Sequence, residues 1–345
     1  MIFTLISGEH PTLPKAEVKA ILEAENFYFK FSDSPPRILR VDVSIEAGKI
    51  IGERAAYTQL ACLELAYTKI SSVEDVLKNI KDINFEDYLS SGESFAVRFR
   101  CIDKDLKSSF KMVESRIGDI ILKRVPGVKV NLEKPDKTFL GIFSGGNLLF
   151  GLVLSSPAKG FGSRSPRRKP FFHPSALQPK IARCMVNLSR VKVDNINGHI
   201  YDPFCGTGTI LIEAGLIGVK KIFGSDIDIR MVKGARLNLK HYGVDGDIFI
   251  ADALNPPVLG VKHVATNPPY GRASKTFGKP SSFLIENFLL KALNFLKKDG
   301  VLCLISSSKI GSSSIAEKLG FKVLEKHFIY VHKSLTREIN VLKPL

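Results

Sequence analysis

The stretch DPFCGTGT, residues 202–209, decides the fold of this chain. The apolar residues 199–201 before it are typical of a short strand, and ILIEA after it, residues 210–214, has helical composition. Gly206 and Gly208 can adopt positive φ at such a strand-to-helix turn, and the first N–H groups of the helix then point at a ligand. We therefore expect a binding crevice at the carboxyl end of a strand in an open α/β sheet. A plain tight turn is the alternative.

The ligand expected at this loop is a nucleoside without a pyrophosphate. The dinucleotide fingerprint G-x-G-x-x-G is incomplete, because Leu211 stands where its third glycine belongs. An acidic residue, Asp226, follows the next apolar run and can hold ribose hydroxyl groups. S-adenosylmethionine meets these demands, since it contains an adenosine and lacks a pyrophosphate.

A second strand end, Asn267-Pro268-Pro269-Tyr270, carries chemistry for an exocyclic amine. Proline fixes φ and cannot extend a sheet, which leaves carbonyl groups without neighbouring N–H donors. The Asn267 side-chain oxygen and the Pro268 carbonyl can then hold the two hydrogens of a planar amine and turn its nitrogen toward a methyl donor. Tyr270 is expected to stack on the base. The alternative is a proline-ended loop with a packed tyrosine.

These motifs resemble a class I S-adenosylmethionine-dependent amino-methyltransferase. The matching segments are residues 202–215, the strand ends at Asp226 and Asp252, and residues 267–272. The longer match, which adds residues 174–188, is similar to the archaeal and eukaryotic tRNA (guanine-10, N2)-methyltransferases that carry a THUMP domain. Specific motifs cover the C-terminal half of the chain, and the N-terminal half matches by layout alone.

The resemblance implies roles for individual residues. The target amine is expected at Asn267, Pro268 and Tyr270. Around S-adenosylmethionine, the family's motif order implies Asp202, Gly206, Thr207 and Gly208 beside the methionine moiety, Asp226 at the ribose, and Asp252 and Ala253 at the adenine, with Pro203, Phe204, Ile227 and Asn267 as further binding residues. Asp228 is the rival for the ribose. We prefer Asp226 because it lies nearer the strand end, which leaves Asp228 to cap a helix. No metal is expected.

One position departs from the family pattern. Many members have Asp where this chain has Asn267. An asparagine side chain cannot take up a proton, so we expect the proton of the amine to leave to solvent after transfer. Whether one methyl group or two is added stays open.

Composition favours a polyanionic partner. The 345 residues include 50 Lys and Arg against 34 Asp and Glu, a formal net charge of +16. Such an excess favours nucleic acid, because each neutralised phosphate releases counterions; a merely basic protein is the alternative. The five cysteines are scattered without metal-ligand spacing and indicate a reducing compartment, so we expect a cytoplasmic protein. The uncharged run 139–154 is predicted to be a hairpin instead of a membrane span, since SGGN interrupts it.

We expect four parts along the chain. Residues 1–55 are predicted to form a ferredoxin-like α+β module, 56–155 a THUMP RNA-binding domain, 156–174 a basic linker, and 175–345 a Rossmann-like methyltransferase domain. A helix is predicted over 54–65, where the first two parts meet. The last domain is expected to be α/β, with a mostly parallel seven-stranded sheet. Its final two strands, 322–331 and 336–342, are predicted to pair as an antiparallel hairpin.

Basic residues in three places are the expected RNA contacts. Arg98 and Arg100 share one face of an alternating strand, for which a solvated face is the alternative. Glycine and proline deny the linker regular structure, and its charge suits phosphate. The linker candidates are Lys159, Arg164, Arg167, Arg168 and Lys169, and Arg272 follows the proline motif. Phe161, Phe171 and Phe172 either stack on bases or anchor the linker in the core.

The resemblance implies methyl transfer to the exocyclic N2 amine of a guanosine in tRNA, with position 10 as the expected site. The alternatives are guanine at another tRNA position such as 6, an adenine or cytosine amine in nucleic acid, and a catalytically inactive RNA-binding module. The family also implies a small zinc-containing activator protein that covers an apolar edge of the methyltransferase sheet.

Overall fold

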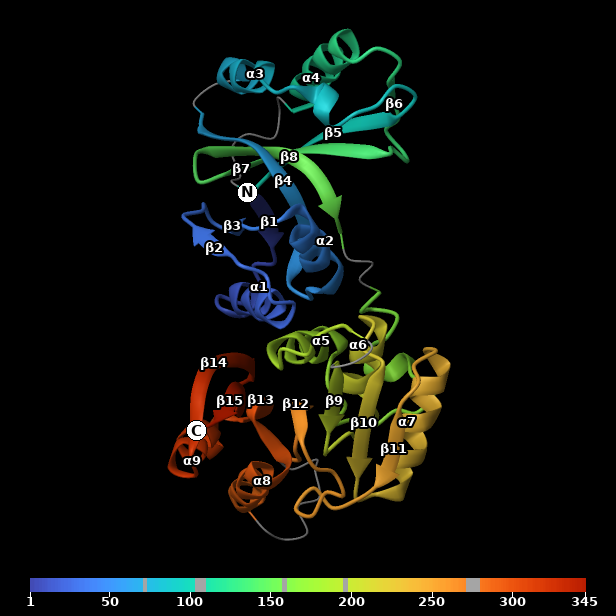
Figure 1. Ribbon diagram of the computed structural model, residues 1–345, viewed down its shortest axis with the longest axis vertical. Helices are drawn as coiled ribbons and strands as arrows, with labels where there is room; N and C mark the ends of the chain where they lie inside the picture. The colour runs from blue at the N-terminus through green and yellow to red at the C-terminus, as the bar shows by residue number, and fades with distance from the viewer. Residues whose placement is uncertain (71–72, 103–109, 157–159, 195–197, 271–279) are drawn as a thin grey trace. The chain divides into compact units, whose positions relative to one another are not determined.

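The computed structural model describes residues 1–70, 73–102, 110–156, 160–194, 198–270 and 280–345. The chain divides into two compact units (Figure 1). The N-terminal unit contains Met1–Glu9, Phe27–Glu53 and Thr58–Pro157, and the C-terminal unit contains His10–Asn26, Arg54–Tyr57 and Ala158–Leu345. The chain therefore passes from one unit to the other after residues 9, 26, 53, 57 and 157, which differs from the simple succession of modules expected from the sequence.

One eight-stranded sheet, of order β2-β3-β1-β4-β8-β7-β5-β6, forms the N-terminal unit. Its strands are β1 Ile2–Ile6, β2 Lys30–Ser32, β3 Ile38–Asp42, β4 Thr58–Lys69, β5 Ser94–Cys101, β6 Lys129–Val130, β7 Lys137–Ser144 and β8 Asn147–Ser155. The helices of this part of the chain are α2 Ile45–Arg54, α3 Val73–Lys81, the short 3-10 helix η1 Phe85–Asp87, and α4 Phe110–Arg124. Strand β4 pairs with β1 on one side and with β8 on the other, so the two expected N-terminal modules share a continuous sheet.

The helix predicted over residues 54–65 is wrong. The helix of this region, α2, ends at Arg54, and most of the predicted segment belongs to strand β4. Three successive side chains of β4, Leu60, Ala61 and Cys62, are buried because both faces of this central strand are covered. Burial on both faces removes the alternation of apolar and polar residues by which a strand is distinguished from a helix.

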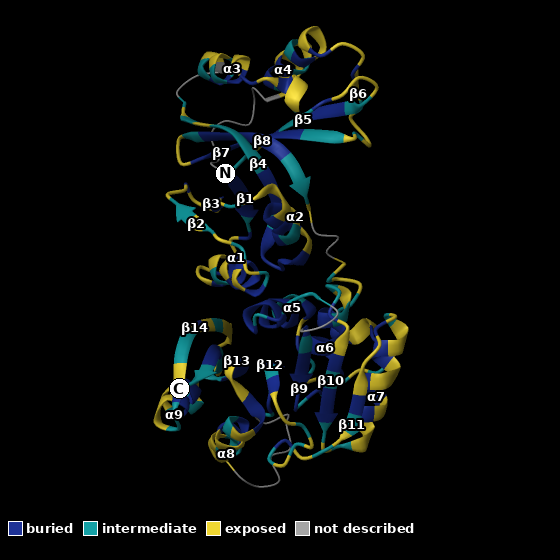
Figure 2. Ribbon diagram, in the orientation of Figure 1, coloured by how far each residue is buried: buried dark blue, intermediate teal, exposed yellow. Residues whose placement is uncertain are grey.

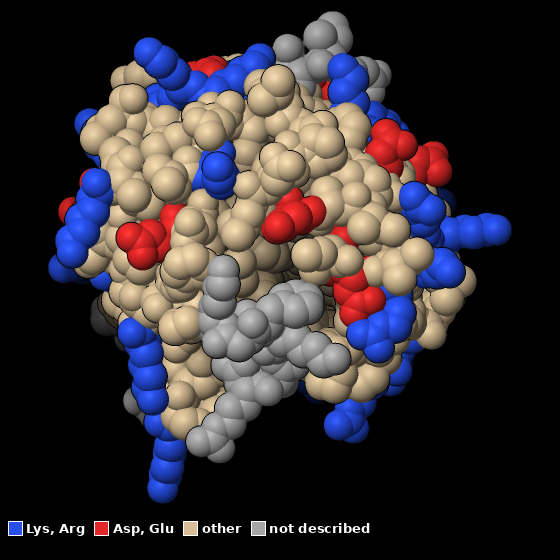
Figure 3. Space-filling view, turned by 90° about the horizontal axis from the view of Figure 1, so that it is seen from below, with Lys and Arg blue, Asp and Glu red and all other residues tan. Residues whose placement is uncertain are grey.

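The C-terminal unit contains a seven-stranded sheet of order β11-β10-β9-β12-β13-β15-β14. Its strands are β9 His199–Asp202, β10 Lys221–Asp226, β11 Asp247–Ile250, β12 Val261–Thr266, β13 Leu296–Ser307, β14 Phe321–His332 and β15 Leu335–Pro344. Strands β9 to β13 are parallel, and β15 runs antiparallel to both of its neighbours, which confirms the predicted hairpin. The carboxyl ends of the parallel strands meet at the side from which Figure 3 is drawn.

Helices cover both faces of this sheet. They are α1 Leu13–Ala24, α5 Pro179–Leu188, α6 Thr209–Leu216, α7 Ile229–His241, α8 Ser281–Phe295 and α9 Ser312–Lys318, with the 3-10 helices η3 Pro166–Arg168 and η4 Ser308–Ile310. Apolar side chains of α1, α5, α6 and α7 pack in one core with Ala265 and Cys303, and those of α8 and α9 pack in another with Val264 and Leu302. Neighbouring strand residues thus point to opposite faces, and the strands lie buried between the helices (Figure 2). This is the α/β methyltransferase architecture expected from the sequence.

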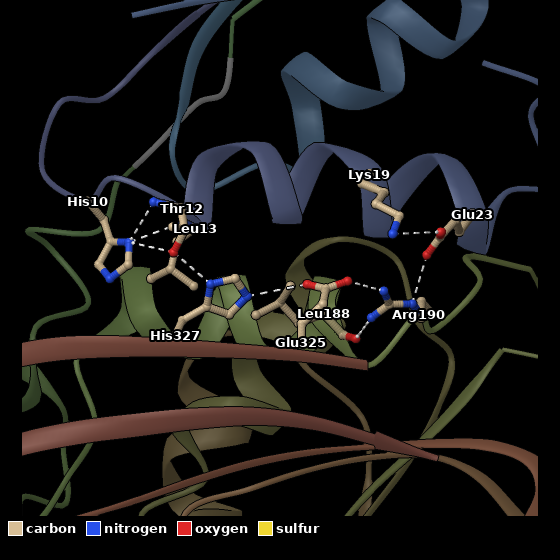
Figure 4. Close-up of polar contacts among 9 residues, drawn as sticks. All are labelled: His10, Thr12, Leu13, Lys19, Glu23, Leu188, Arg190, Glu325 and His327. Atoms are coloured by element: carbon tan, nitrogen blue, oxygen red, sulfur yellow. Dashed lines mark hydrogen bonds and ion pairs between the residues drawn. The ribbon is translucent and has the colours of Figure 1, made fainter. Parts of the chain in front are cut away.

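Helix α1 belongs to the C-terminal unit although it lies near the start of the chain. Its start is fixed on strand β14 by a row of polar contacts (Figure 4). The ring of His10 accepts hydrogen bonds from the N–H groups of Thr12 and Leu13, and the Thr12 hydroxyl lies 2.7 Å from Nδ1 of His327. At the other end of the helix, Arg190 pairs with both Glu23 of α1 and Glu325 of β14.

A buried carboxylate, Glu17, fixes the middle of α1. It accepts hydrogen bonds from the backbone N–H groups of Ala56 and Tyr57 and from the side-chain amide of Asn187, all between 2.8 and 2.9 Å. Burial raises the pKa of Glu17, and these three donors oppose that rise. Residues 54–57 are thereby tied to α1 and α5 by hydrogen bonds inside one core.

None of the described helices is both long and apolar enough to cross a bilayer.

Candidate active site

A cavity of about 720 Å³ opens at the carboxyl ends of the parallel strands in the C-terminal unit. Its walls come from the 202–209 loop, the segments that follow β10, β11 and β12, and the hairpin of β14 and β15. The chain leaves β9 and β12 in opposite directions along the sheet, and such a reversal creates a crevice in open α/β sheets. Figure 3 shows acidic side chains toward the middle of this face and Lys and Arg side chains mainly toward its margin.

The loop between β9 and α6 forms one wall. Gly206 and Gly208 have φ of +50° and +76°, in the left-handed region that favours glycine. A Cβ at Gly208 would lie 2.7 Å from the side chain of Leu239 on α7, so this glycine permits close packing. At Gly206 no atom would lie closer than 4.0 Å, which leaves room for a ligand beside the backbone. The N–H of Gly206 donates to the carboxylate of Asp226 at 3.0 Å.

Asp202 joins the two motifs singled out in the sequence. It is the last residue of β9, and its buried carboxylate accepts a hydrogen bond of 2.7 Å from the hydroxyl of Thr266, the last residue of β12. The N–H of Phe204 donates to the same oxygen at 3.1 Å. The glycine loop and Asn267 therefore lie on one cavity, as the hypothesis of a shared site requires. Burial raises the pKa of Asp202 to about 7, because the charged form loses its hydration.

Two further acidic residues, Asp226 and Asp228, lie at the carboxyl end of β10. The Asp226 carboxylate accepts from the N–H groups of Gly206 and Asp228, each at 3.0 Å, which fixes its orientation at the cavity wall. Burial raises the pKa of Asp226, and these two donors oppose that rise. Asp228 accepts from the N–H of Arg230 at 2.9 Å, which confirms its predicted role as the cap of α7.

The proline motif supplies an acceptor that lacks a donor. Oδ1 of Asn267 is buried and has no hydrogen-bond partner within the described residues. Pro268 and Pro269, which also line the cavity, contribute no N–H groups that could satisfy it. A buried acceptor without a partner costs about 1–3 kcal/mol. A ligand that donates N–H to this oxygen would remove that cost.

Comparisons with known proteins agree with this geometry. A family model described as RMKL-like, methyltransferase domain, matches residues 166–339, and a THUMP domain model matches residues 71–143. A tRNA (guanine(10)-N2)-dimethyltransferase from Methanothermobacter thermautotrophicus is 36% identical over 345 residues, which cover 99% of each chain. The chain belongs to this family of tRNA (guanine(10)-N2)-dimethyltransferases. A member from Pyrococcus abyssi is 33% identical, again over 99% of each chain.

The fold of this family member also occurs in a solved structure. The crystal structure of TrmN from Thermus thermophilus has a TM-score of 0.54 and 21% sequence identity, and the match covers 100% of this chain and 99% of that chain. S-adenosylmethionine is the cofactor of this methyltransferase. The cavity has room for it, because the backbone at Gly206 is open to a ligand and the carboxylate of Asp226 is held at the cavity wall.

Nearly all residues expected at the cofactor and the amine line the cavity. They are Asp202, Pro203, Phe204, Gly206, Thr207, Asp226, Ile227, Asp252, Ala253, Asn267, Pro268 and Tyr270. Gly208 is not among the lining residues, because its α-carbon faces Leu239 and Ala235 of α7. Asp252 accepts a hydrogen bond from the N–H of Leu254 and stays exposed.

The linker residues do not share one environment. Two of them face the interior of the C-terminal unit: Arg164 pairs with Glu213 at 2.8 Å, and the buried Lys169 donates to the hydroxyl of Thr209 at 2.5 Å. Burial lowers the pKa of Lys169 to about 8. Arg164 thus pairs with a carboxylate, and Lys169 is buried against a neutral hydroxyl group, so neither position supports the expected contact with phosphate. Arg167 and Arg168, in η3, are exposed.

The remaining RNA candidates lie elsewhere. Arg98 and Arg100 belong to β5 of the N-terminal unit; Arg98 donates to the carbonyl oxygen of Leu132 at 2.6 Å, and Arg100 is exposed. Lys159 and Arg272 lie outside the described residues.

Sequence reasoning missed a buried charge cluster behind the loop. Glu213 of α6 pairs with Arg164 and with Arg183 of α5, each at 2.8 Å. Burial lowers the pKa of Arg183, and Glu213 opposes that change. The sequence contains one indication of this cluster, because Glu213 is an acidic residue within the apolar run ILIEA. A charge at such a position needs a buried partner of opposite charge.

Asp202→Asn is expected to raise the free energy of unfolding of the cofactor-free protein at pH 8 and to change it much less at pH 4. In the unaltered protein, the pKa of Asp202 is about 7 when folded, above the ordinary value of 3.8. The contribution of Asp202 to stability is therefore complete below about pH 4 and is lost as pH rises through 7. Asparagine removes the cost of the buried charge, up to about 4 kcal/mol at pH 8, and keeps an acceptor for Thr266. Urea unfolding of both proteins from pH 4 to pH 8 measures the difference. Parallel profiles would contradict this prediction, and Asp252→Asn is the exposed control.

Proposed function

We propose that this protein transfers methyl groups from S-adenosylmethionine to the N2 amine of guanosine 10 in tRNA. The observation that carries this proposal is the buried, unpartnered Oδ1 of Asn267 in the same cavity as the glycine loop. Family membership along the whole chain supports tRNA as the substrate and position 10 as the target. The names of both relatives support the addition of two methyl groups.

The residues of the cavity orient the reacting nitrogen. In the first transfer, Oδ1 of Asn267 and the carbonyl oxygen of Pro268 accept one hydrogen each from the guanine amine, which fixes the direction of the nitrogen lone pair; in the second, the one remaining hydrogen bonds to one of them. When bound, S-adenosylmethionine supplies the methyl group on a positively charged sulfur. Positioning and electrostatic stabilisation thus provide the rate enhancement. Asn267 cannot hold the proton that the amine releases, so that proton leaves to solvent.

Nucleoside analysis tests this proposal. Unmodified tRNA is incubated with the protein and labelled S-adenosylmethionine, digested, and examined by mass spectrometry for N2-methylguanosine and N2,N2-dimethylguanosine. A tRNA in which guanosine 10 is replaced by adenosine serves as the control. Label in both tRNAs would move the target to another position, and label in neither would refute the proposal.

Exposed arginines of the linker are proposed to contact tRNA phosphate. We expect Arg167→Gln with Arg168→Gln to weaken tRNA binding and to lower the slope of log Kd against log salt by about one for each phosphate that is no longer neutralised. Affinity measurements between 50 and 300 mM salt provide that slope. Lys318→Gln with Lys322→Gln, which also removes two exposed positive charges, one from α9 and one from β14, is the control. If the slope stays the same in the double variant, the linker does not contact phosphate.

We also propose a protein partner and a cellular location for this protein. A small zinc-containing activator would find exposed apolar side chains on both outer strands of the sheet, Ile250 on β11 and Phe328 and Tyr330 on β14. Purification of the tagged protein from its native cells, followed by zinc analysis of bound proteins, tests this partner. We propose the cytoplasm as the location, on the basis of the family and the reduced cysteines.

A further inference from the structure

We call the Asn267 side-chain oxygen and the Pro268 carbonyl oxygen, the two proposed acceptors for the guanine amine, the amine clamp. Arg337 is a cation on the same cavity wall that the amine clamp does not use. It lies in β15, opposite Ser307 of β13 and Ile329 of β14. The antiparallel hairpin thereby brings Arg337 to the carboxyl ends of the parallel strands. It lines the same cavity as Asn267, Pro268 and Tyr270.

One N–H group of the Arg337 guanidinium has no hydrogen-bond acceptor among the described residues. Its Nε is buried and has no hydrogen-bond partner within the described residues. The neighbouring carboxylate, Glu338, lies on the opposite side of the strand, where it accepts from Ser313 and pairs with Lys326. Arg337 also acts on Tyr270: burial raises the pKa of that hydroxyl, and the charge and hydrogen bonding of Arg337 oppose the rise. A ligand with acceptor atoms would satisfy the buried donor.

The amine clamp cannot distinguish one base from another. Adenine, cytosine and guanine each carry an exocyclic amine that the Asn267 and Pro268 oxygens could hold. Guanine differs in presenting two acceptors, O6 and N7, whereas adenine has an amine donor in place of O6. The planar fork of an arginine matches the O6 and N7 pair with two parallel hydrogen bonds.

We propose that Arg337 recognises O6 and N7 of the target guanine and makes the cavity selective for that base. This role depends on the proposed function, because it assigns the far edge of a base whose N2 amine lies in the clamp. Arg337 is then a specificity residue: it contacts the ring on the side away from the transferred methyl group. Adenine in the same position would place an amine donor against the guanidinium.

A substrate that keeps the amine and lacks O6 tests this assignment. tRNA is assembled from synthetic halves with either guanosine or 2-aminopurine at the methylated position, and kcat/KM is measured for each. For the unaltered protein we expect 2-aminopurine to react about 10- to 100-fold more slowly. Arg337→Gln should slow methylation of guanosine by a similar factor and that of 2-aminopurine by a smaller factor, because 2-aminopurine keeps N7 and offers no O6 to the guanidinium. Arg337→Lys, which keeps the charge without the fork, should recover only part of the preference.

Two measurements separate this role from a structural one. Affinity for S-adenosylmethionine and the thermal midpoint should stay close to those of the unaltered protein, and Lys322→Gln, the same charge change at the far end of the hairpin, should leave the preference intact. Should Arg337→Gln fail to fold, the comparison of both bases with Arg337→Lys decides. An equal loss on both substrates, with a salt slope lower by about one, would assign Arg337 to a phosphate and overturn the proposal. Methylation of neither tRNA by the unaltered protein would instead refute the proposed function.

Discussion

Asn267→Ala is expected to slow methyl transfer to tRNA by about 100- to 1,000-fold. The variant removes a buried acceptor that has no partner among the described residues, so the effect falls on the orientation of the guanine amine. Affinity for S-adenosylmethionine should change by less than about threefold, because the glycine loop and Asp226 are untouched. Single-turnover kinetics with saturating tRNA measure the first quantity, and calorimetry measures the second.

Two further variants make this result specific. Asn267→Asp keeps an oxygen at the same place and should retain much of the activity. Asn287→Ala is the matched control, because its side-chain amide donates to the backbone of its own helix. Full turnover in Asn267→Ala would show that the clamp does not hold the amine.

Glu213→Ala is expected to lower the free energy of unfolding by about 3–5 kcal/mol. The carboxylate is almost fully buried, with its side chain 1% exposed, and it pairs with Arg164 and Arg183, which are 11% and 8% exposed. Its removal leaves two guanidinium charges with little access to water. Alanine is the best helix former, so weaker helix propensity in α6 cannot account for the loss. Urea unfolding at pH 7 provides the measurement.

A comparable change on the surface provides the control for Glu213. Glu317→Ala removes a carboxylate from the exposed face of α9 and should cost less than about 0.5 kcal/mol. A loss below about 1 kcal/mol for Glu213→Ala would mean that water reaches the cluster and screens the two arginines.

The C-terminal unit was predictable because its decisive residues act locally. Glycine permits a left-handed turn in any context, as at Gly206 and Gly208, and proline ends a strand independently of distant residues, as at Pro268 and Pro269. Strand β12 is buried on both faces in its second half, but Gly260 before it and the two prolines after it mark its bounds in the sequence. Strand β4 lacks this advantage, because burial on both faces makes its sequence resemble a helix.

Other features depend on partners that are distant in the sequence. The charge of Arg164 is visible in the composition, but its partner, Glu213, is supplied by another element 49 residues further on. Arg337 carries no local signal at all; only the register of β15 against β13 brings it to the cavity. Pairings over such distances arise from tertiary packing and cannot be derived from propensity or spacing.

The place of α1 limits how this protein can be rearranged. A fragment that starts after residue 157 lacks α1 and residues 54–57, so the apolar side chains that cover Leu13 and Ala20 would meet water and Asn187 would lose Glu17. A single recombination point therefore cannot transfer the complete C-terminal unit to another protein. A functional exchange between relatives has to carry the early helix along with the distal sequence, which couples the inheritance of the two ends of the chain.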